Sequence, residues 1–200
     1  TFDDKDDKGN DGISQVYYVI VKEGISPIDP DKPLDPNNPN TTPKPGDKVP
    51  GDPKQRTFEQ LGLLDEVNRT INYRYANTDK VEEAKRGQEA AATVEQKLRY
   101  SRKGDLNKVT GEITYGNWTA KDGDTTFDKV ESPVVKGYIL KDAKQKEVAA
   151  TTGLTADSKD ENIKVVYTKL GSWVPKVPEG ETPIDPLPYP NDPNDPTNPG

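Results

Sequence analysis

The stretch GEITYGNWTAKDGDTTFDKVESPVVKGYIL, residues 111–140, decides the fold of this chain. It opens with an aromatic run in which apolar and polar residues alternate, passes through a polar turn with glycine, and ends in a second apolar run. Such alternation is typical of a half-buried β-strand. Because the stretch contains no group of reactive side chains, the fold and the function depend on what the flanking segments add to it.

Proline divides the chain into parts. Nine of the 19 prolines lie between Pro27 and Pro53, and nine lie between Pro175 and Pro199. Only 30% of the residues are hydrophobic and 32% are charged, which is too polar for a core that runs the full length. The proline-poor middle, of about a hundred residues, has the size of a small domain.

Composition also excludes several classes of function. The net charge is −7 and there is no basic tract, so the chain repels phosphate and nucleic acid is not expected as a partner. No run of about 20 apolar residues is present, and no membrane span is predicted. Histidine and cysteine are absent, which excludes disulfides, zinc sites built on thiolate or imidazole, and a Ser-His-Asp triad.

Period-two alternation predicts a series of strands in the middle of the chain. The clear runs are Ile13–Lys22, Asn68–Tyr75, Thr93–Arg102, Glu112–Trp118, Gly137–Leu140 and Glu161–Lys169, and Val148 marks a short one. We expect Thr93–Arg102 and Glu112–Trp118 to form an antiparallel pair, with a polar connection after the first of them.

Helical signals are weak by comparison. Thr57 followed by Gln60 matches a capping box, which predicts one or two helical turns with Phe58, Leu61 and Leu64 on one side. The other candidates are Asp79–Ala92, which we interpret as a polar loop with helical turns, and a single turn within residues 127–135.

The first proline-rich tract has a proline at every third residue from Pro27 to Pro39. Polyproline II has three residues per turn, so this spacing predicts a stiff, extended spacer. We therefore divide the chain into the last strand of a preceding domain (1–24), a linker (25–55), a domain (56–172) and a second linker (173–200). Trp173 is expected to bury the root of the second linker against the domain.

Two short segments of the chain are nearly identical. Ser-Pro-Ile-Asp-Pro at 26–30 returns as Thr-Pro-Ile-Asp-Pro at 182–186. Each follows a charged loop and an aromatic strand, and each leads into a tract of Asn-Pro and Asp-Pro. Repetition of this kind is the signature of an array of similar modules.

Four segments of the chain carry a family resemblance. RTINYRYAN (69–77), KVTGEITYGNWT (108–119), FDKVESPVVKGYIL (127–140) and TADSKDENIKVVYTK (155–169) resemble the mucus-binding (Mub) repeats of lactobacilli, which contain mucin-binding-protein (MucBP) domains. The resemblance implies an α+β fold, namely a β-grasp (ubiquitin-like) and mainly antiparallel sheet domain, flanked by proline-rich linkers. The charged insert Asp79–Ala92 departs from the family pattern.

The resemblance also implies a function without catalysis. It implies an extracellular adhesin repeat at the bacterial cell wall surface that binds mucin glycans as a monomeric module of a tandem array. Immunoglobulin binding at an exposed strand edge and a purely structural spacer are the alternatives. An enzyme with two carboxylates, such as a glycosidase, is not expected.

Candidate binding residues are aromatic or acidic. Aromatic side chains serve as platforms for sugar rings, and the candidates are Trp118, Tyr100, Tyr115 and Tyr138, with core packing as the competing interpretation for each. No cofactor is required. A structural calcium ion is the one metal considered, because carboxylates in loops hold calcium. Its candidate ligands are Asp122, Asp124, Asp157, Asp160 and Glu161.

Overall fold

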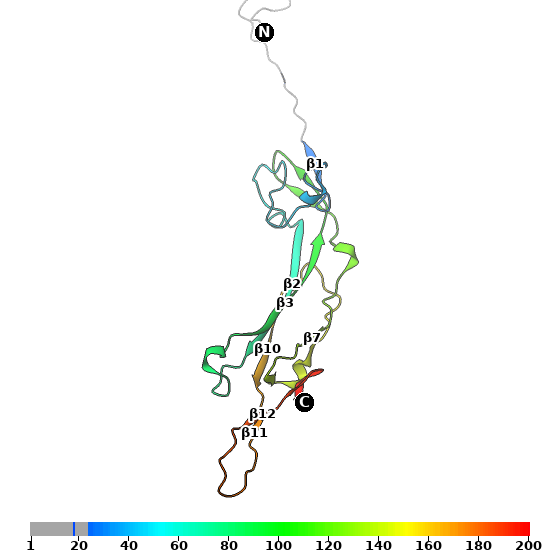
Figure 1. The fold of residues 1–200 in the computed structure, drawn as a ribbon. Helices are drawn as coiled ribbons and strands as arrows, with labels where there is room; N and C mark the ends of the chain where they lie inside the picture. Colours follow the sequence, from blue (N-terminus) through cyan, green and yellow to red (C-terminus); the bar gives the residue numbers. More distant parts are fainter. Residues whose placement is uncertain (1–17, 19–23) are drawn as a thin grey trace, which may run out of the picture.

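The computed structural model describes residue 18 and residues 24–200. The loop and the strand expected before residue 24 therefore lie outside the described residues, apart from Tyr18. The described part is elongated and mostly β (Figure 1). Its helical elements are four short 3₁₀ helices, so the α+β class expected from the sequence is corrected to a mostly β fold. No helix in residues 24–200 is long and apolar enough to cross a membrane.

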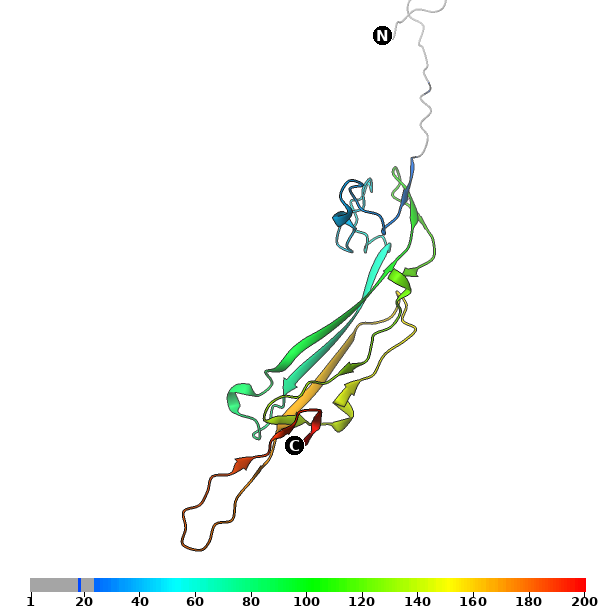
Figure 2. The same cartoon turned by 45° about the vertical axis from the view of Figure 1, so that its right-hand side comes forward.

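A five-stranded sheet forms the body of the molecule. Its order is β6-β3-β2-β10-β8. The strands are β2 (Leu64–Tyr75), β3 (Glu89–Ser101), β6 (Thr119–Ala120), β8 (Tyr138–Leu140) and β10 (Glu161–Lys169). β2 runs antiparallel to β3 and parallel to β10, and the three long strands lie side by side along the body in Figure 2.

The strand predictions hold best where alternation is longest. The structure confirms Glu161–Lys169 as a strand and places Asn68–Tyr75 within β2. On β2, Ile71 and Tyr73 are buried, and on β10, Val165 and Tyr167 are buried. These residues share one core with Tyr138 and Leu140 of β8.

A three-stranded sheet forms the end of the described part at which β1 lies (Figure 1). It consists of β1 (Ile25–Ile28), β4 (Gly104–Asn107) and β5 (Ile113–Tyr115), in the order β1-β4-β5. The antiparallel pairing expected between Thr93–Arg102 and Glu112–Trp118 is wrong, because β5 pairs with β4. The chain reverses between β4 and β5, where the Asn107 side chain accepts hydrogen bonds from the Val109 and Thr110 amides.

The remaining elements are short. They are β7 (Val130–Glu131), β9 (Glu147–Val148), β11 (Ser172–Trp173), β12 (Leu187–Pro188), β13 (Asn191–Asp192), β14 (Asp195–Pro199), η1 (Pro39–Thr41), η2 (Glu83–Lys85), η3 (Lys121–Gly123) and η4 (Ala143–Lys146). The short strand expected at Val148 is confirmed as β9.

Two of the helical predictions fail in part or entirely. The turn expected within residues 127–135 is replaced by β7 and by a bridge in which Phe127 and Thr151 exchange two backbone hydrogen bonds. Phe127 is fully buried there, and its burial fixes the extended backbone. In Asp79–Ala92, η2 supplies a helical turn, but residues from Glu89 onward belong to β3.

The segment 25–55, expected as an extended spacer, is folded onto the body. Ile28 lies in β1, and Val49 and Asp52 are buried. The capping box is confirmed, since Gln60 N donates to Thr57 Oγ1 (3.1 Å) and Thr57 N donates to Gln60 Oε1 (2.9 Å). Residues of this region share a core made of Val49, Phe58, Leu61, Leu63, Leu64 and Leu106. Burial of the apolar side chains that lie between the prolines therefore folds this segment onto the domain, in place of the predicted extended spacer.

The C-terminal tract also departs from the expected linker. β11 and β12 form a hairpin whose loop projects from the far end of the body (Figure 2). Trp173 is 47% exposed, so the burial expected for it is wrong. The chain then returns to the body, where the Asn191 side chain accepts from Gly137 N (2.6 Å) and donates to Tyr138 O (2.7 Å).

Candidate functional site

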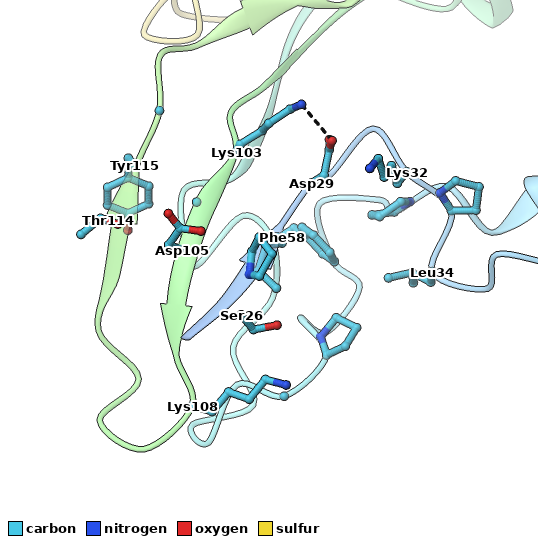
Figure 3. A pocket seen from close by; sticks show the side chains of 18 residues that line it. Ser26, Asp29, Lys32, Leu34, Phe58, Lys103, Asp105, Lys108, Thr114 and Tyr115 are labelled. Atoms are coloured by element: carbon cyan, nitrogen blue, oxygen red, sulfur yellow. Dashed lines mark ion pairs between the residues drawn. The ribbon is translucent and has the colours of Figure 1, made fainter. Parts of the chain in front are cut away.

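A cavity of about 870 Å³ lies at the end of the molecule formed by β1, β4 and β5. The three-stranded sheet forms one wall, and turns of the proline-rich segment form the other (Figure 3). The buried ring of Phe58 is part of the lining. The cavity therefore exists only because the segment 25–55 is folded.

Charged side chains of both signs line this cavity. They are Lys32, Lys103, Lys108, Asp29 and Asp105. Lys103 Nζ lies 3.0 Å from Asp29 Oδ2, which joins β1 to the start of β4. The Lys103 side chain remains 73% exposed, so this pair is weak and open to exchange with a ligand. The lining thus offers both hydrogen-bond donors and acceptors to a polar ligand.

Tyr115 is the exposed aromatic residue of the cavity. It ends β5 and is 46% exposed. The Arg102 guanidinium lies 3.8 Å from the centroid of the Tyr115 ring and 4.6 Å from that of Trp118. Arg102 is itself fixed, because its Nε donates to Gly62 O at 2.5 Å. The stack holds Tyr115 in place and leaves part of its ring open to solvent.

The other three aromatic candidates lie outside the cavity lining. Trp118 is half-buried, stacked on Arg102 and packed against the core that contains Tyr100. Tyr100 and Tyr138 are each 3% exposed, and burial raises the pKa of both phenols. Packing, the competing interpretation, therefore describes Tyr100 and Tyr138, whereas the exposure of Tyr115 fits a platform.

Tyr138 has a structural environment of its own. Its hydroxyl donates to Glu82 and accepts from Lys85 Nζ (3.2 Å). Lys169 Nζ lies 2.8 Å from Glu82 Oε1. Hydrogen bonds from Lys169 and then from Tyr138 lower the pKa of Glu82 to about 2. These contacts attach the charged insert to β8 and β10.

The structure does not bring the five acidic candidates together. Asp160 Oδ1 accepts from Asn68 N (2.7 Å), Glu161 Oε2 lies 2.8 Å from Arg69 Nε, and Asp124 Oδ1 accepts from Thr126 N (3.0 Å). Asp122 and Asp157 are exposed. Within the part of the chain that the structure describes, no three acidic side chains converge as a metal site would require. The structural calcium ion stays an untested hypothesis.

Sequence reasoning missed most of the cavity. Tyr115 was the one candidate that lines it, and the lysines and Asp29 were not singled out. Asp29 and Lys32 follow β1, and Lys103 and Lys108 flank β4. No sequence pattern signals this cluster, because its members are separated by up to about 80 residues of chain and meet only through the pairing of β1 with β4.

The comparison with protein families decides where this domain belongs. The model of the Muc B2-like domain matches residues 59–171, more than half of the chain. The chain belongs to the Muc B2-like domain family. The resemblance found in the sequence is thereby confirmed. No curated protein matches this Muc B2-like chain.

Solved structures similar to the Muc B2-like chain are MucBP and Mub domains. The mucin-binding domain of Spr1345 from Streptococcus pneumoniae is 30% identical over 54% of this chain and 92% of that one, with a TM-score of 0.41. Mub-RV is 27% identical over 53% of both chains, with a TM-score of 0.42. The MucBP domain of an adhesion protein from Pediococcus pentosaceus is 29% identical over 52% of this chain and 97% of that one, with a TM-score of 0.37. At TM-scores below 0.5, the assignment rests on the sequence match.

Proposed function

We propose that this chain is an extracellular adhesin repeat that binds mucin glycans through the cavity beside Tyr115. It acts at the bacterial cell wall surface, as one module among several, and it catalyses no reaction. Membership of the Muc B2-like family supports binding to mucin, and a similar domain of 30% identity is described as mucin-binding. The observation that carries the choice of site is the exposed, fixed ring of Tyr115 in a cavity lined by charged side chains.

The chemistry of a sugar suits this cavity. A sugar ring has a face of C–H groups that packs against an aromatic ring, and hydroxyls around its rim that need hydrogen-bond partners. Tyr115 offers the first, and Asp29, Lys32 and Lys108 offer the second. At about 870 Å³, the cavity lies within the usual size range of ligand pockets, roughly 300–1,000 Å³.

Weak binding by one module is compatible with adhesion. The cavity is open, and its charged groups are largely solvated, so a single site gains little from each contact. Several modules on one chain raise the effective concentration of sites and the overall avidity, by roughly 10²–10⁴. Mucin presents many glycans on each molecule and is a suitable multivalent partner.

Mutation of Tyr115 tests the site. Mucin coated on a surface should retain the native chain when it is presented multivalently on beads, and Tyr115→Ala should lose at least tenfold in retention. Tyr189→Ala is the matched control, because Tyr189 is 43% exposed and outside the cavity. Equal retention of both variants would reject the cavity, and no retention of the native chain would reject mucin binding.

Immunoglobulin binding is a second candidate that one observation favours. On the side away from β2, the described part of the chain pairs with β3 only at Tyr100 with Ala120 and at Ser101 with Thr119. From Glu89 to Arg99, no strand in the described residues pairs with that edge, which leaves it open to an added strand. Thr93→Pro should abolish such binding in a pull-down with immunoglobulin while leaving mucin retention unchanged. If the chain binds neither mucin nor immunoglobulin, a purely structural spacer is the remaining function.

We also infer that the domain is a variant of the β-grasp fold. The central parallel pair of β2 and β10, with β3 and β8 outside it, supports this inference. The helix of that fold would be replaced by the extended segment between β6 and β8. An experimental structure that places a helix there, or another strand order, would reject the inference.

A further inference from the structure

The two similar segments of the chain can be aligned over more than their Pro-Ile-Asp-Pro core. Both read Glu-Gly-x-Ser/Thr-Pro-Ile-Asp-Pro, at residues 23–30 and 179–186. After one additional residue in the second segment, DPNNP at 35–39 aligns with DPNDP at 192–196. We name residues 24–43 the first tract and residues 180–200 the second tract.

The first tract supplies a strand to the domain that follows it. β1 pairs antiparallel with β4, with Pro27 opposite Asp105 and Ile28 opposite Gly104. Ile28 packs against the core that contains Leu106. Beyond β1, Pro30 is buried, and its carbonyl accepts a hydrogen bond from Arg99 Nη2 at 3.2 Å.

The second tract contains nearly the same sequence as β1, but within residues 24–200 no strand pairs with that segment. Thr182–Pro186 lies in the loop between β11 and β12, and Ile184 is 50% exposed. This loop projects at the end of the body opposite to β1 and β4 (Figures 1 and 2). Five exposed apolar side chains gather on this hairpin and the residue after it: Trp173, Val174, Ile184, Leu187 and Tyr189.

The Asp-Pro turns of the two tracts fold alike. Asp35 Oδ1 accepts from Asn37 N at 2.9 Å, and Asp192 Oδ1 accepts from Asn194 N at 2.8 Å. Three residues later, Asn38 Oδ1 accepts from Asn40 N at 3.1 Å. Its aligned residue Asp195 accepts from Thr197 N at 2.9 Å. The tracts therefore share local structure as well as sequence.

The two tracts bury opposite sides of this shared unit. In the first tract Pro30 is buried and Pro39 is exposed, whereas in the second the aligned Pro186 is exposed and Pro196 is buried. The first tract contacts the domain after it. The second contacts the domain before it, through Asn191 and through Asp195, whose Oδ2 lies 3.1 Å from Lys146 Nζ.

We propose that the second tract is a two-sided joint whose free side docks on a second copy of this module. Thr182–Ile184 pairs with β4 of that copy as Ser26–Ile28 pairs with β4 here. Pro186 takes the place of Pro30, and Asp185 takes the place of Asp29 beside Lys103. Consecutive modules are then joined by a shared, folded tract that fixes their relative orientation.

One aligned position differs chemically between the tracts. Asp31 Oδ2 accepts a hydrogen bond from Ser101 Oγ at 2.8 Å, and Leu187 stands at the aligned position. Ser101 would lose this acceptor in the joint. Loss of a single hydrogen bond of this type lowers an equilibrium constant by roughly fivefold, so the difference weakens the docking but leaves the strand pairing and the Ile184 contact in place.

A two-copy chain tests the joint directly. Residues 1–200 are followed by a second copy that begins at Lys44, so that the second tract replaces Ser26–Pro43 of that copy. Cysteine replaces Pro183 of the first copy and Asp105 of the second, in a protein without native cysteine. Opposed residues of antiparallel strands have Cα atoms about 4.5–5.5 Å apart, which permits a disulfide.

The proposal expects a disulfide in most molecules of this chain under mild oxidation. In the matched control, Pro183→Cys and Asp105→Cys are both placed in the first copy, at opposite ends of one body, and remain reduced. Equal oxidation in the two chains, or none in either, overturns the proposal. So does a second copy that fails to unfold cooperatively in urea, because the second tract would then be unable to replace β1.

A substitution in the loop separates docking from local structure. Ile184→Asp should leave the stability of the 200-residue chain unchanged, since the side chain is half exposed there. In the two-copy chain it should lower the folding equilibrium constant of the second copy at least tenfold. Val174→Asp, on the same hairpin and 65% exposed, should change neither. Equal effects of the two substitutions would reject the joint.

Discussion

The positively charged side chains in the middle of the large sheet and at the cavity end differ in burial and in number of partners. In the middle, Arg69 is 1% exposed and bonds Glu161, Gln96, the Asp128 carbonyl and Thr151, at distances of 2.5–3.3 Å. At the cavity end, Lys103 has one carboxylate partner and remains 73% exposed. Arg69 ties several segments together, whereas Lys103 keeps its donors available.

The physical reason for this contrast is desolvation. A charge taken out of water needs a full set of partners, because the solvation it loses is worth several kcal/mol. Arg69 has these partners and also lies over the Phe127 ring, 4.9 Å from its centroid. An exposed lysine keeps its water and gains little from one ion pair. The middle of the sheet, around Arg69, is therefore the structural frame of the domain. At the cavity end, the charged side chains stay solvated and are able to exchange their partners.

The largest effect is expected at the frame. Arg69→Met should lower the free energy of unfolding by about 3–5 kcal/mol, because it leaves the Glu161 carboxylate and the Thr151 hydroxyl without their partner. Lys97→Met is the control, since Lys97 Nζ pairs with Glu66 at 2.8 Å but is 59% exposed, and it should lose at most about 1 kcal/mol. Urea unfolding measures both. Equal losses would remove the distinction between frame and surface.

A close packing contact at the cavity end should have the next effect. A Cβ atom on Gly104 would lie 2.7 Å from Ile113 Cδ1 and 3.0 Å from Leu63 Cδ2. Gly104→Ala should therefore cost about 1–3 kcal/mol through overpacking. Gly116→Ala, whose Cβ would meet only the Lys103 carbonyl at 3.5 Å, is the control in the same thermal unfolding experiment. A neutral Gly104→Ala would mean that this sheet is loosely packed.

Acidic pH should lower the stability of the fold through protonation of Asp52. Hydrogen bonds from the Arg56 side chain lower the pKa of the buried Asp52 carboxyl from 3.8 to about 2. A lowered pKa stabilises the fold above pH 3.8 by about 2 kcal/mol. This contribution falls as the pH drops from 3.8 towards 2. The stability difference between the native chain and Asp52→Asn, measured in urea, should shrink over this range. A constant difference would contradict the assignment.

Tyr115 should matter little for stability. Its ring is 46% exposed and its main contact is the stack on Arg102, so Tyr115→Ala should cost less than about 1 kcal/mol. Thermal unfolding beside Tyr115→Phe, which keeps the stack, measures this cost. A loss above about 2 kcal/mol would make Tyr115 a core residue and would remove the aromatic platform from the cavity.

Calcium should have the smallest effect. The prediction that no cofactor is required implies the same melting temperature in EDTA and in millimolar calcium. The variant with Asp122→Asn and Asp124→Asn is the comparison for any shift that does occur. A rise of several degrees with calcium, lost in this variant, would establish a structural ion and place it in the turn after β6.

Local pattern predicted the long strands but not how they pair. Alternation located β10 and most of β2. In a half-buried strand, apolar residues face the core and polar residues face solvent at alternate positions, so the pattern is visible in the sequence. It placed Glu112–Trp118 beside the wrong strand, because pairing depends on where the chain turns. The cavity escaped prediction for the same reason, since Asp29 and Lys103 meet only through the pairing of β1 with β4.

The sequence by itself determined the long strands, the family and the repetition of the proline-rich tract. Each of these depends on residues that are neighbours in the chain or that recur in a fixed order. Only the tertiary structure decided that the first tract is folded, that Tyr115 faces a cavity and that Tyr100 and Tyr138 are buried. Spacing of prolines predicts the local backbone, but packing of Ile28 and Val49 against a core that contains Leu106 determines where that backbone lies.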